Sequence, residues 1–167
     1  MSTSNNIELS LPTLSDGMAV FRLVENSPPL DGNSSYCNFL QCSHFANTSV
    51  AAKDGDTLVG FVSAYVIPER PNTLFVWQVA VSEQARGLGL ASSMIAHILG
   101  RISCQDVRYI ETSITQDNQA SWALFRRLAK TLSTELQASP WMDKDTHFSG
   151  QHESESLVRI GPFTHNS

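Results

Sequence analysis

Two glycines stand between a strand-like segment and a helix-like segment, and this junction constrains the fold more than any other feature of the chain. Thr73–Val81 is apolar and rich in β-branched residues, and it is followed by Gln84-Ala-Arg-Gly-Leu-Gly-Leu-Ala91, which we call the glycine loop. Gly87 and Gly89 allow the backbone to turn so that several N–H groups face one anion, and the dipole of the following helix adds positive potential there. The junction therefore predicts a site for the phosphate groups of a cofactor.

The residues after the glycine loop have the spacing of a helix that buries one face, and Gly100 ends the pattern. The apolar positions are Ala91, Met94, Ile95, Ile98 and Leu99. The loop lacks the third glycine of a dinucleotide-binding fingerprint and the Gly-Lys-Ser/Thr of a nucleoside triphosphate loop, so both of these classes are excluded.

Length and composition narrow the class of protein further. The 167 residues favour one domain, with 7–163 as its folded part and 1–6 and 164–167 as flexible ends. The chain has 41% apolar residues, no apolar run of membrane length and no leader pattern, so we expect a cytoplasmic protein without a membrane partner. The net charge of −5, without basic clusters, argues against nucleic acid as a partner and is compatible with a cationic substrate.

Turn signals divide the chain into helix-like and strand-like segments without an internal repeat. The predicted elements are a strand at 7–11, helices after Asp16 and after Asn33 or Ser34, strands at 48–53, 57–66 and 73–81, the helix after the glycine loop, a strand at 108–115, a helix after Asn118, and strands at 132–137 and 156–160. Met18, Phe21 and Val24 are the predicted apolar face of the first helix. The order β-α-α-β-β-β-α-β-α-β-β indicates a mixed α/β protein.

The glycine loop resembles the Gln/Arg-x-x-Gly-x-Gly/Ala signature with which the GNAT acyltransferases bind the pyrophosphate of acyl-coenzyme A. The resemblance implies an α/β (α+β) fold: a single GNAT-type domain with a mixed, mostly antiparallel central sheet, flanked by helices and splayed between its fourth and fifth strands. It implies acetyl-coenzyme A as co-substrate, bound by Val79, Ala80, Val81, Gln84, Ala85, Arg86, Gly87, Leu88, Gly89, Leu90, Ala91 and Asn118. Asn118 can alternatively serve only as a helix cap.

Longer segments resemble the diaminobutyrate acetyltransferases of ectoine biosynthesis. They are Pro28–Phe45, Leu58–Ser63, Pro68–Val81, Glu111–Asn118, Ala120–Phe125 and Leu157–Phe163, and the resemblance covers nearly the whole chain from Leu9 to Phe163. That family acetylates the 4-amino group of L-2,4-diaminobutyrate, and ectoine synthase cyclises the product to a compatible solute. The resemblance therefore implies L-2,4-diaminobutyrate as substrate and a role in osmoadaptation.

Acetyl transfer to an amine needs a base, because an alkyl ammonium group has a pKa near ~10 and must lose a proton before it attacks. Glu111 is the only carboxylate in 108–115, and the preceding strand contains none. We therefore expect Glu111 to be the general base at the splay and to contact the substrate; the alternative is a surface glutamate at a strand edge.

Four further residues are expected to bind the substrate. Asp31 would bind an ammonium group, or else cap a helix. Tyr36 and Trp77 would enclose the aliphatic chain, or else belong to the core. His152 resembles the family's C-terminal histidine that reaches the substrate, whereas His147 has less support.

Phe125 departs from the GNAT pattern, since many members have a tyrosine there that protonates the leaving thiolate. A non-catalytic acyl-coenzyme A sensor is therefore an alternative, as is acetylation of another small amine or of a protein N-terminus. Cys37, Cys42 and Cys104 lie away from the glycine loop, which favours direct transfer in a ternary complex over an acetyl-enzyme. We also expect no metal site, a homodimer, and a lid at 139–154.

Overall fold

The computed structural model describes residues 6–28, 30 and 32–165. Asp31, one of the predicted substrate-binding residues, lies outside these ranges. The described residues form two compact units that alternate along the chain. The first unit comprises Met1–Tyr65 and Gln78–Gln105, and the second comprises Val66–Trp77 and Asp106–Ser167.

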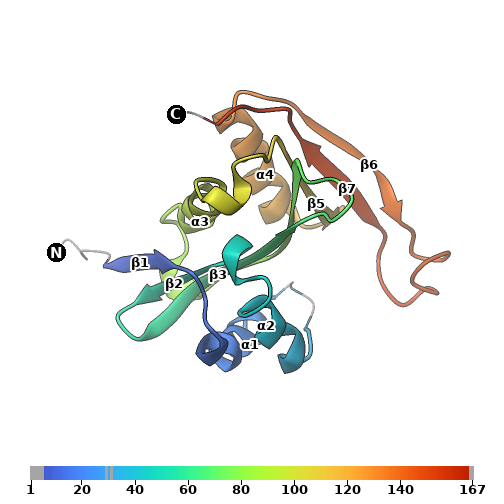
Figure 1. Ribbon diagram of the computed structural model, residues 1–167. Helices are drawn as coiled ribbons and strands as arrows, with labels where there is room; N and C mark the ends of the chain where they lie inside the picture. The colour runs from blue at the N-terminus through green and yellow to red at the C-terminus, as the bar shows by residue number, and fades with distance from the viewer. Residues whose placement is uncertain (1–5, 29, 31, 166–167) are drawn as a thin grey trace. The chain divides into compact units, whose positions relative to one another are not determined.

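The helices and strands follow in the predicted order (Figure 1). They are β1 (Ile7–Ser10), α1 (Gly17–Glu25), α2 (Ser35–Gln41), β2 (Val50–Asp54), β3 (Thr57–Val66), β4 (Thr73–Val81), α3 (Leu90–Leu99), β5 (Tyr109–Thr115), α4 (Gln119–Thr131), β6 (Leu136–Met142) and β7 (Glu155–Ile160). The strands form one mixed sheet in the order β1-β2-β3-β4-β5-β7-β6. The first half of β4 belongs to the second unit and its last residues belong to the first.

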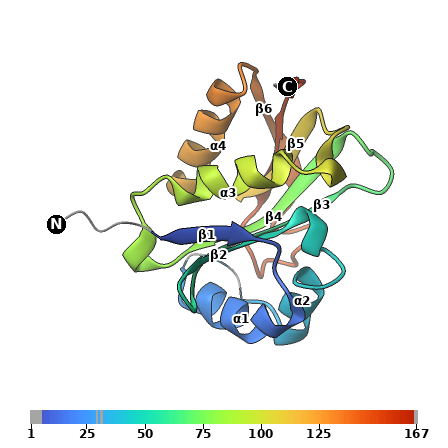
Figure 2. The ribbon, with the colours of Figure 1, turned by 60° about the vertical axis from the view of Figure 1, so that its left-hand side comes forward.

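In the first unit, β2 pairs antiparallel with both β1 and β3. Figure 2 shows α3 on one side of these strands and α1 with α2 on the other. The core on the side of α1 is formed by Val20, Leu23, Val24, Cys42, Phe61 and Ala80. The helix-like spacing after Asp16 thus produces an amphipathic helix whose apolar stripe is buried against the sheet.

The predicted apolar face of α1 is partly wrong. Met18 is exposed and Phe21 is half-buried, whereas Val20 and Leu23 are buried with Val24. The close approach of α1 to α2 explains the rotation: a Cβ atom on Gly17 would lie 2.3 Å from the Phe39 ring. The side of α1 that carries Gly17 therefore faces α2. Met18, one residue later and about 100° around the helix, faces solvent.

The helix after the glycine loop forms as predicted and packs directly on β3. Leu90, Met94, Ile95, Ile98 and Leu99 are buried, while Ala91 at the edge of the stripe is half-buried. At the start of α3 the contact with the sheet is close, because a Cβ atom on Gly60 would lie 3.0 Å from both Leu90 Cδ2 and Met94 Cε.

In the second unit, β7 pairs antiparallel with both β5 and β6, and the parallel register of β4 with β5 is short. It runs from Thr73 opposite Tyr109 to Phe75 opposite Glu111. Next to it, the Thr112 hydroxyl donates a hydrogen bond of 3.0 Å to the carbonyl of Val76, so a side chain contacts the main chain of the neighbouring strand there. Helix α4 buries its predicted face of Leu124, Phe125, Leu128 and Ala129.

Strand β6 differs from the prediction of a strand at 132–137. Leu132 caps α4, and Ser133 follows in the left-handed region with φ 56°, so the strand begins at Leu136. It continues to Met142 through Pro140, which is tolerated because β6 is the edge strand of the sheet. The segment 139–154 is therefore not one connection, because β6 extends to Met142 and only 143–154 connects β6 to β7. Its role as a lid stays a prediction.

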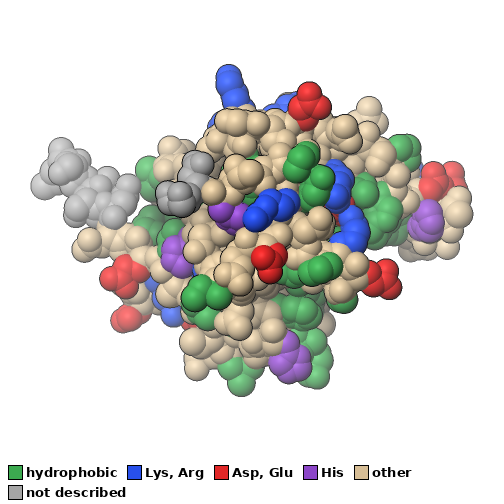
Figure 3. Space-filling model, turned by 45° about the horizontal axis from the view of Figure 1, so that its top comes forward, with side chains coloured by type: hydrophobic (Ala, Val, Ile, Leu, Met, Phe, Trp, Pro, Cys, Tyr) green, Lys and Arg blue, Asp and Glu red, His purple; other side chains and the backbone are tan. Residues whose placement is uncertain are grey.

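The surface carries side chains of mixed character. Figure 3 shows acidic, basic and hydrophobic side chains interspersed on the face drawn there. Among the described residues, no helix combines the length and apolarity needed to cross a membrane.

Candidate active site

The glycine loop joins the end of β4 to α3 and has the backbone of an anion site. Gly87 and Gly89 have φ values of 80° and 70°, a region that favours glycine, and a Cβ atom on either would find no other group within 4 Å. Gly89 is the N-cap residue of α3 and has no side chain that could cap the helix. The N–H groups of the first turn of α3 therefore remain available to an anionic ligand.

The other residues predicted to contact the coenzyme in this region differ in how exposed their side chains are. Gln84, Arg86 and Leu88 are exposed, so their side chains are accessible to a ligand. The buried Ala85 and Leu90 instead pack the loop against the first unit. In β4, Ala80 is buried in the core, while Val79 and Val81 on either side of it are half-buried.

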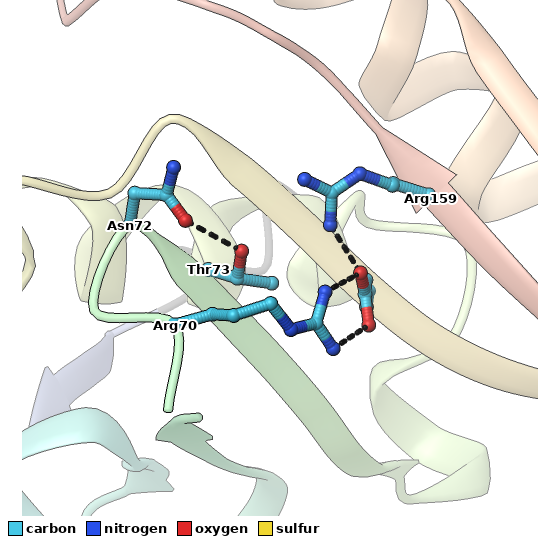
Figure 4. A network of polar contacts seen from close by, with 5 residues as sticks. Arg70, Asn72, Thr73 and Arg159 are labelled. Carbon is cyan, nitrogen blue, oxygen red and sulfur yellow. Dashed lines mark hydrogen bonds and ion pairs between the residues drawn. The ribbon is translucent and has the colours of Figure 1, made fainter. Parts of the chain in front are cut away.

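Glu111 lies on β5 in the second unit and is held by two arginines, Arg70 and Arg159. Figure 4 shows these two arginines pointing toward one another from separate segments, with dashed lines marking their ion pairs. The Glu111 side chain is only 2% exposed. Arg70, in the turn before β4, makes a two-point ion pair with it: Nη1 is 2.5 Å from Oε2 and Nη2 is 2.9 Å from Oε1. Arg159 Nη1 donates to the same Oε2 atom. The predicted alternative of a surface glutamate is excluded by this burial.

Arg159 is fixed from two sides. It stands directly opposite Glu111 in the antiparallel register of β5 and β7. Its guanidinium carbon also lies 3.8 Å from the centre of the Tyr109 ring, a cation–π contact. Strand pairing and ring stacking together hold this arginine beside the carboxylate.

The electrostatics of Glu111 result from opposing effects. Burial raises the pKa of the carboxyl group, but hydrogen bonds and charge attraction from Arg70 and Arg159 outweigh it, so the pKa is held below its ordinary value. The ion pair in turn raises the pKa of Arg70. Glu111 is therefore ionised in the free protein, and its proton affinity is low as long as both arginines remain in place.

Tyr36 and Trp77 are exposed aromatic side chains, at 71% and 37%, so the alternative that they belong to the core is excluded. Tyr36 projects from α2 in the first unit, and Trp77 lies on β4 in the second. A buried amide chain fixes α2: Asn38 Nδ2 donates to Gln41 Oε1 (3.0 Å), and Gln41 Nε2 donates to Gln78 Oε1 (3.3 Å). The chain joins the helix that carries Tyr36 to the strand residue after Trp77.

His152 and Glu111 lie at different places in the second unit. His152 is in the connection between β6 and β7, stacked near Phe148 with ring centres 4.6 Å apart. That connection joins β7 at Glu155, which pairs with Thr115 at the end of the β5–β7 ladder remote from Glu111. The structure thus brings Glu111 together with two arginines and places His152 elsewhere in the same unit.

Arg70 and Arg159 were missed by the sequence analysis. Arg70 stands in the segment Pro68-Glu-Arg-Pro-Asn, and Arg159 stands in the C-terminal tail, so nothing local marks either as a partner of Glu111. A predicted β5–β7 register would have placed Arg159 beside Glu111, whereas Arg70 required the conformation of the turn.

Comparison with known proteins identifies the family. A sequence model of the Acetyltransferase (GNAT) family matches residues 18–129, which include parts of both units. The chain belongs to the GNAT family of acetyltransferases. The predicted family and the single GNAT-type domain with its mixed sheet are thereby confirmed.

Three similar proteins are diaminobutyrate acetyltransferases. The chain is 59% identical over 157 residues to the L-2,4-diaminobutyric acid acetyltransferase of Methylotuvimicrobium alcaliphilum, covering 94% of this chain and 91% of that protein. It is 48% identical over 149 residues to the enzyme of the same name from Vibrio cholerae, covering 89% and 86%. The solved diaminobutyrate acetyltransferase EctA from Paenibacillus lautus, in complex with its substrate L-2,4-diaminobutyric acid and coenzyme A, is 34% identical, with a TM-score of 0.92 over 98% of this chain and 99% of that one.

Two features of α4 can now be compared with the GNAT pattern. Asn118 is the N-cap residue of α4, and its side-chain oxygen accepts a hydrogen bond from the Ser121 N–H (3.2 Å). This capping role uses the oxygen and leaves the amide nitrogen for a ligand. Phe125 is 2% exposed in the core of the second unit, so the position of the usual tyrosine is occupied by a buried hydrocarbon ring.

The cysteines have the properties of unreactive thiols, with Cys42 and Cys104 buried and Cys37 half-buried. Burial raises the pKa of Cys37 and Cys104, and raises that of Cys42 to about 12. A thiol in such a state is a poor nucleophile because the thiolate is scarcely populated at neutral pH. Among the described residues, no group of three or more His, Cys, Asp or Glu side chains is arranged to hold a metal ion.

Proposed function

We propose that this chain transfers the acetyl group of acetyl-coenzyme A to the 4-amino group of L-2,4-diaminobutyrate, giving N4-acetyl-L-2,4-diaminobutyrate. The observation that carries the proposal is the likeness, over nearly the whole chain, to the Paenibacillus lautus enzyme with its bound substrate and coenzyme A. The two folds agree with a TM-score of 0.92 over 98% of this chain, so the same reaction is expected of both.

The glycine loop would hold the pyrophosphate of the coenzyme. Gly87 and Gly89 leave room for the anion where other residues would place a Cβ atom, and the first turn of α3 supplies N–H groups and the positive end of its dipole. Gln84 and Arg86 would add side-chain contacts. We assign the backbone of Val79–Val81 to the pantetheine arm, which can pair with a strand edge as another strand would.

Acetyl transfer then proceeds directly between the two substrates. The neutral 4-amino group attacks the thioester carbonyl carbon, the C–N bond forms, and the C–S bond breaks to release coenzyme A as thiolate. The proton of the ammonium group passes to Glu111, directly or through one water molecule. With phenylalanine at 125, the thiolate is protonated by solvent, which suffices because an ordinary thiol has a pKa of only ~8.5.

The acceptor site combines Glu111 with four residues assigned by family resemblance. Asp31 would bind the second ammonium group, Tyr36 and Trp77 would enclose the short aliphatic chain, and His152 would complete the site when substrate is bound. The exposure of both aromatic side chains supports this assignment, because part of each is accessible to a ligand.

The product would be the precursor for ring closure to ectoine, so we also propose a role in osmoadaptation. We further propose a cytoplasmic homodimer without a nucleic-acid or membrane partner, whose catalytic domain extends over 7–163. A symmetric dimer is the commonest assembly of soluble enzymes.

The test is thiol release from acetyl-coenzyme A in the presence of L-2,4-diaminobutyrate, ornithine, lysine or 1,3-diaminopropane, with the acetylated nitrogen located by NMR. A strong preference for diaminobutyrate, acetylated at N4, is expected. Coenzyme binding without acetylation of any amine would instead favour an acyl-coenzyme A sensor. Preference for another amine would retain the enzyme class and replace the substrate.

A further inference from the structure

The two arginines that hold Glu111 differ in how firmly they are themselves held. Arg159 is on a strand, in register with Glu111 and stacked on Tyr109, and its side chain is 31% exposed. Arg70 is in the turn between β3 and β4, and its side chain is 46% exposed. The Tyr109 ring and the pairing of β5 with β7 fix the guanidinium of Arg159, whereas solvent reaches that of Arg70.

The ion pairs of the cluster are unequal in charge. Two guanidinium groups contact one carboxylate, while Glu69 next to Arg70 acts on that arginine through charge attraction. Because Arg70 is the more exposed of the two, an incoming anion meets its guanidinium first. A guanidinium binds a carboxylate in two-point geometry, which is the way Arg70 now binds Glu111.

We propose that Arg70 is a specificity and positioning residue: the carboxylate of the amino-acid substrate takes the Arg70 guanidinium over from Glu111, which keeps Arg159 as its ionic partner. This inference rests on the proposed function, because it assigns the exchange to an acceptor that carries a carboxylate next to its amines. The exchange replaces one carboxylate by another on the same guanidinium, so no charge is left unpaired on Arg70.

The exchange would connect substrate recognition to proton transfer. With both arginines in place the pKa of Glu111 is low and its carboxylate is a weak base. Removal of Arg70 takes away the two-point ion pair, while Arg159 and burial remain, so the carboxylate gains proton affinity. The charged groups that act on this site are Arg159 on β7, which is stacked on Tyr109 of β5, and Arg70 with the neighbouring Glu69 in the turn. A diamine that lacks a carboxylate would leave Glu111 paired with both arginines.

The experiment compares two acceptors in three proteins. L-2,4-diaminobutyrate and 1,3-diaminopropane have the same three-carbon spacing of amines, and only the first has a carboxylate. For wild type, R70Q and R159Q, kcat and KM are measured with each acceptor, and the preference is the ratio of the two kcat/KM values. Circular dichroism and coenzyme A binding establish that each variant is folded.

R70Q is expected to lower the preference for diaminobutyrate by about 100-fold, the scale of a lost two-point charged contact. R70K, which keeps the charge without the planar fork, should recover only part of it. R159Q is the matched control: it also removes a guanidinium from Glu111, and it should affect both acceptors alike. If R70Q and R159Q changed the preference equally, or if neither changed it, the special role of Arg70 would be refuted.

The pH dependence of kcat tests the exchange itself. In wild type, the acidic limb with diaminobutyrate should lie at higher pH than the limb with diaminopropane, because only diaminobutyrate removes Arg70 from Glu111. In R70Q the two limbs should coincide, which separates the effect from titration of the acceptors. Equal limbs in wild type would overturn the exchange, whereas the absence of diaminobutyrate acetylation in wild type would refute the proposed function instead.

Discussion

The glycine loop, for which we propose an anionic ligand, and the Glu111 cluster are built in opposite ways. The binding groups of the loop would be main-chain N–H groups, next to the exposed Gly87 and Gly89, which adopt a conformation that other residues avoid. The cluster surrounds a buried carboxylate and consists of side chains from three separate parts of the second unit. The loop is therefore specified by neighbouring residues, and the cluster is specified by the fold.

This difference predicts how each site responds to mutation. A backbone site tolerates most side-chain changes and fails when its conformation is lost. A side-chain site keeps its conformation and fails when one charge is removed, because the remaining charges are then left without partners. The following predictions test this contrast, beginning with the largest effect.

E111Q should reduce kcat about 1000-fold, since glutamine occupies the same volume but cannot accept a proton from the ammonium group. Steady-state kinetics with acetyl-coenzyme A and diaminobutyrate provide the measurement. E155Q is the control, because Glu155 lies on the same β5–β7 ladder at its other end. If E111Q had the same turnover and pH dependence as wild type, Glu111 would not be the general base.

G89V should weaken coenzyme A binding by roughly 10- to 100-fold, corresponding to the strain of a β-branched residue at positive φ. Isothermal titration calorimetry measures this affinity directly. Gly55 offers a matched control: it has φ 63° in the turn between β2 and β3, with equally open surroundings. G55V should lower the free energy of unfolding and leave the affinity for coenzyme A unchanged. Equal losses of affinity in G55V and G89V would mean that backbone strain acts through the whole first unit rather than through the glycine loop.

The same contrast explains what could be predicted from the sequence. The order of elements, the buried face of α3 and the turn of the glycine loop depend on residues that are neighbours in the sequence, and each was predicted. The rotated face of α1 depends on Gly17 meeting Phe39, and the extension of β6 through Pro140 depends on its place at the sheet edge. Glu111 could be proposed as the one carboxylate of its strand, but Arg70 reaches it only through the turn after β3.

The stability of the protein should depend on pH through Glu111. Its pKa in the folded state lies below the ordinary value of ~4.3, so the ion pairs stabilise the fold above that pH. This stabilisation is lost as the pH falls through the lower pKa of the folded state. Urea unfolding of wild type and E111Q should therefore differ by about 1 kcal/mol more at neutral pH than in acid, the scale of partly exposed ion pairs. If the difference in unfolding free energy between wild type and E111Q did not change with pH, the ion pairs with the arginines would not stabilise the ionised carboxylate.

C37A should show the smallest effect, with turnover unchanged, because burial raises the pKa of this thiol and direct transfer needs no acetyl-cysteine. Initial-rate patterns with both substrates varied should intersect in wild type and variant, as expected for a ternary complex. Parallel lines in double-reciprocal plots, or a labelled acetyl group retained on the protein, would contradict direct transfer. Either result would mean that a side chain carries the acetyl group between the two substrates.

The contact of Gly60 with α3 has an evolutionary consequence. A Cβ atom on Gly60 of β3 would lie 3.0 Å from Leu90 Cδ2 and from Met94 Cε, at the first turn of α3. A larger residue at this position would meet the ends of the Leu90 and Met94 side chains, which would have to shift to make room for it. Substitutions at Gly60 are therefore expected to be inherited together with changes at Leu90 or Met94, the two side chains that would have to yield.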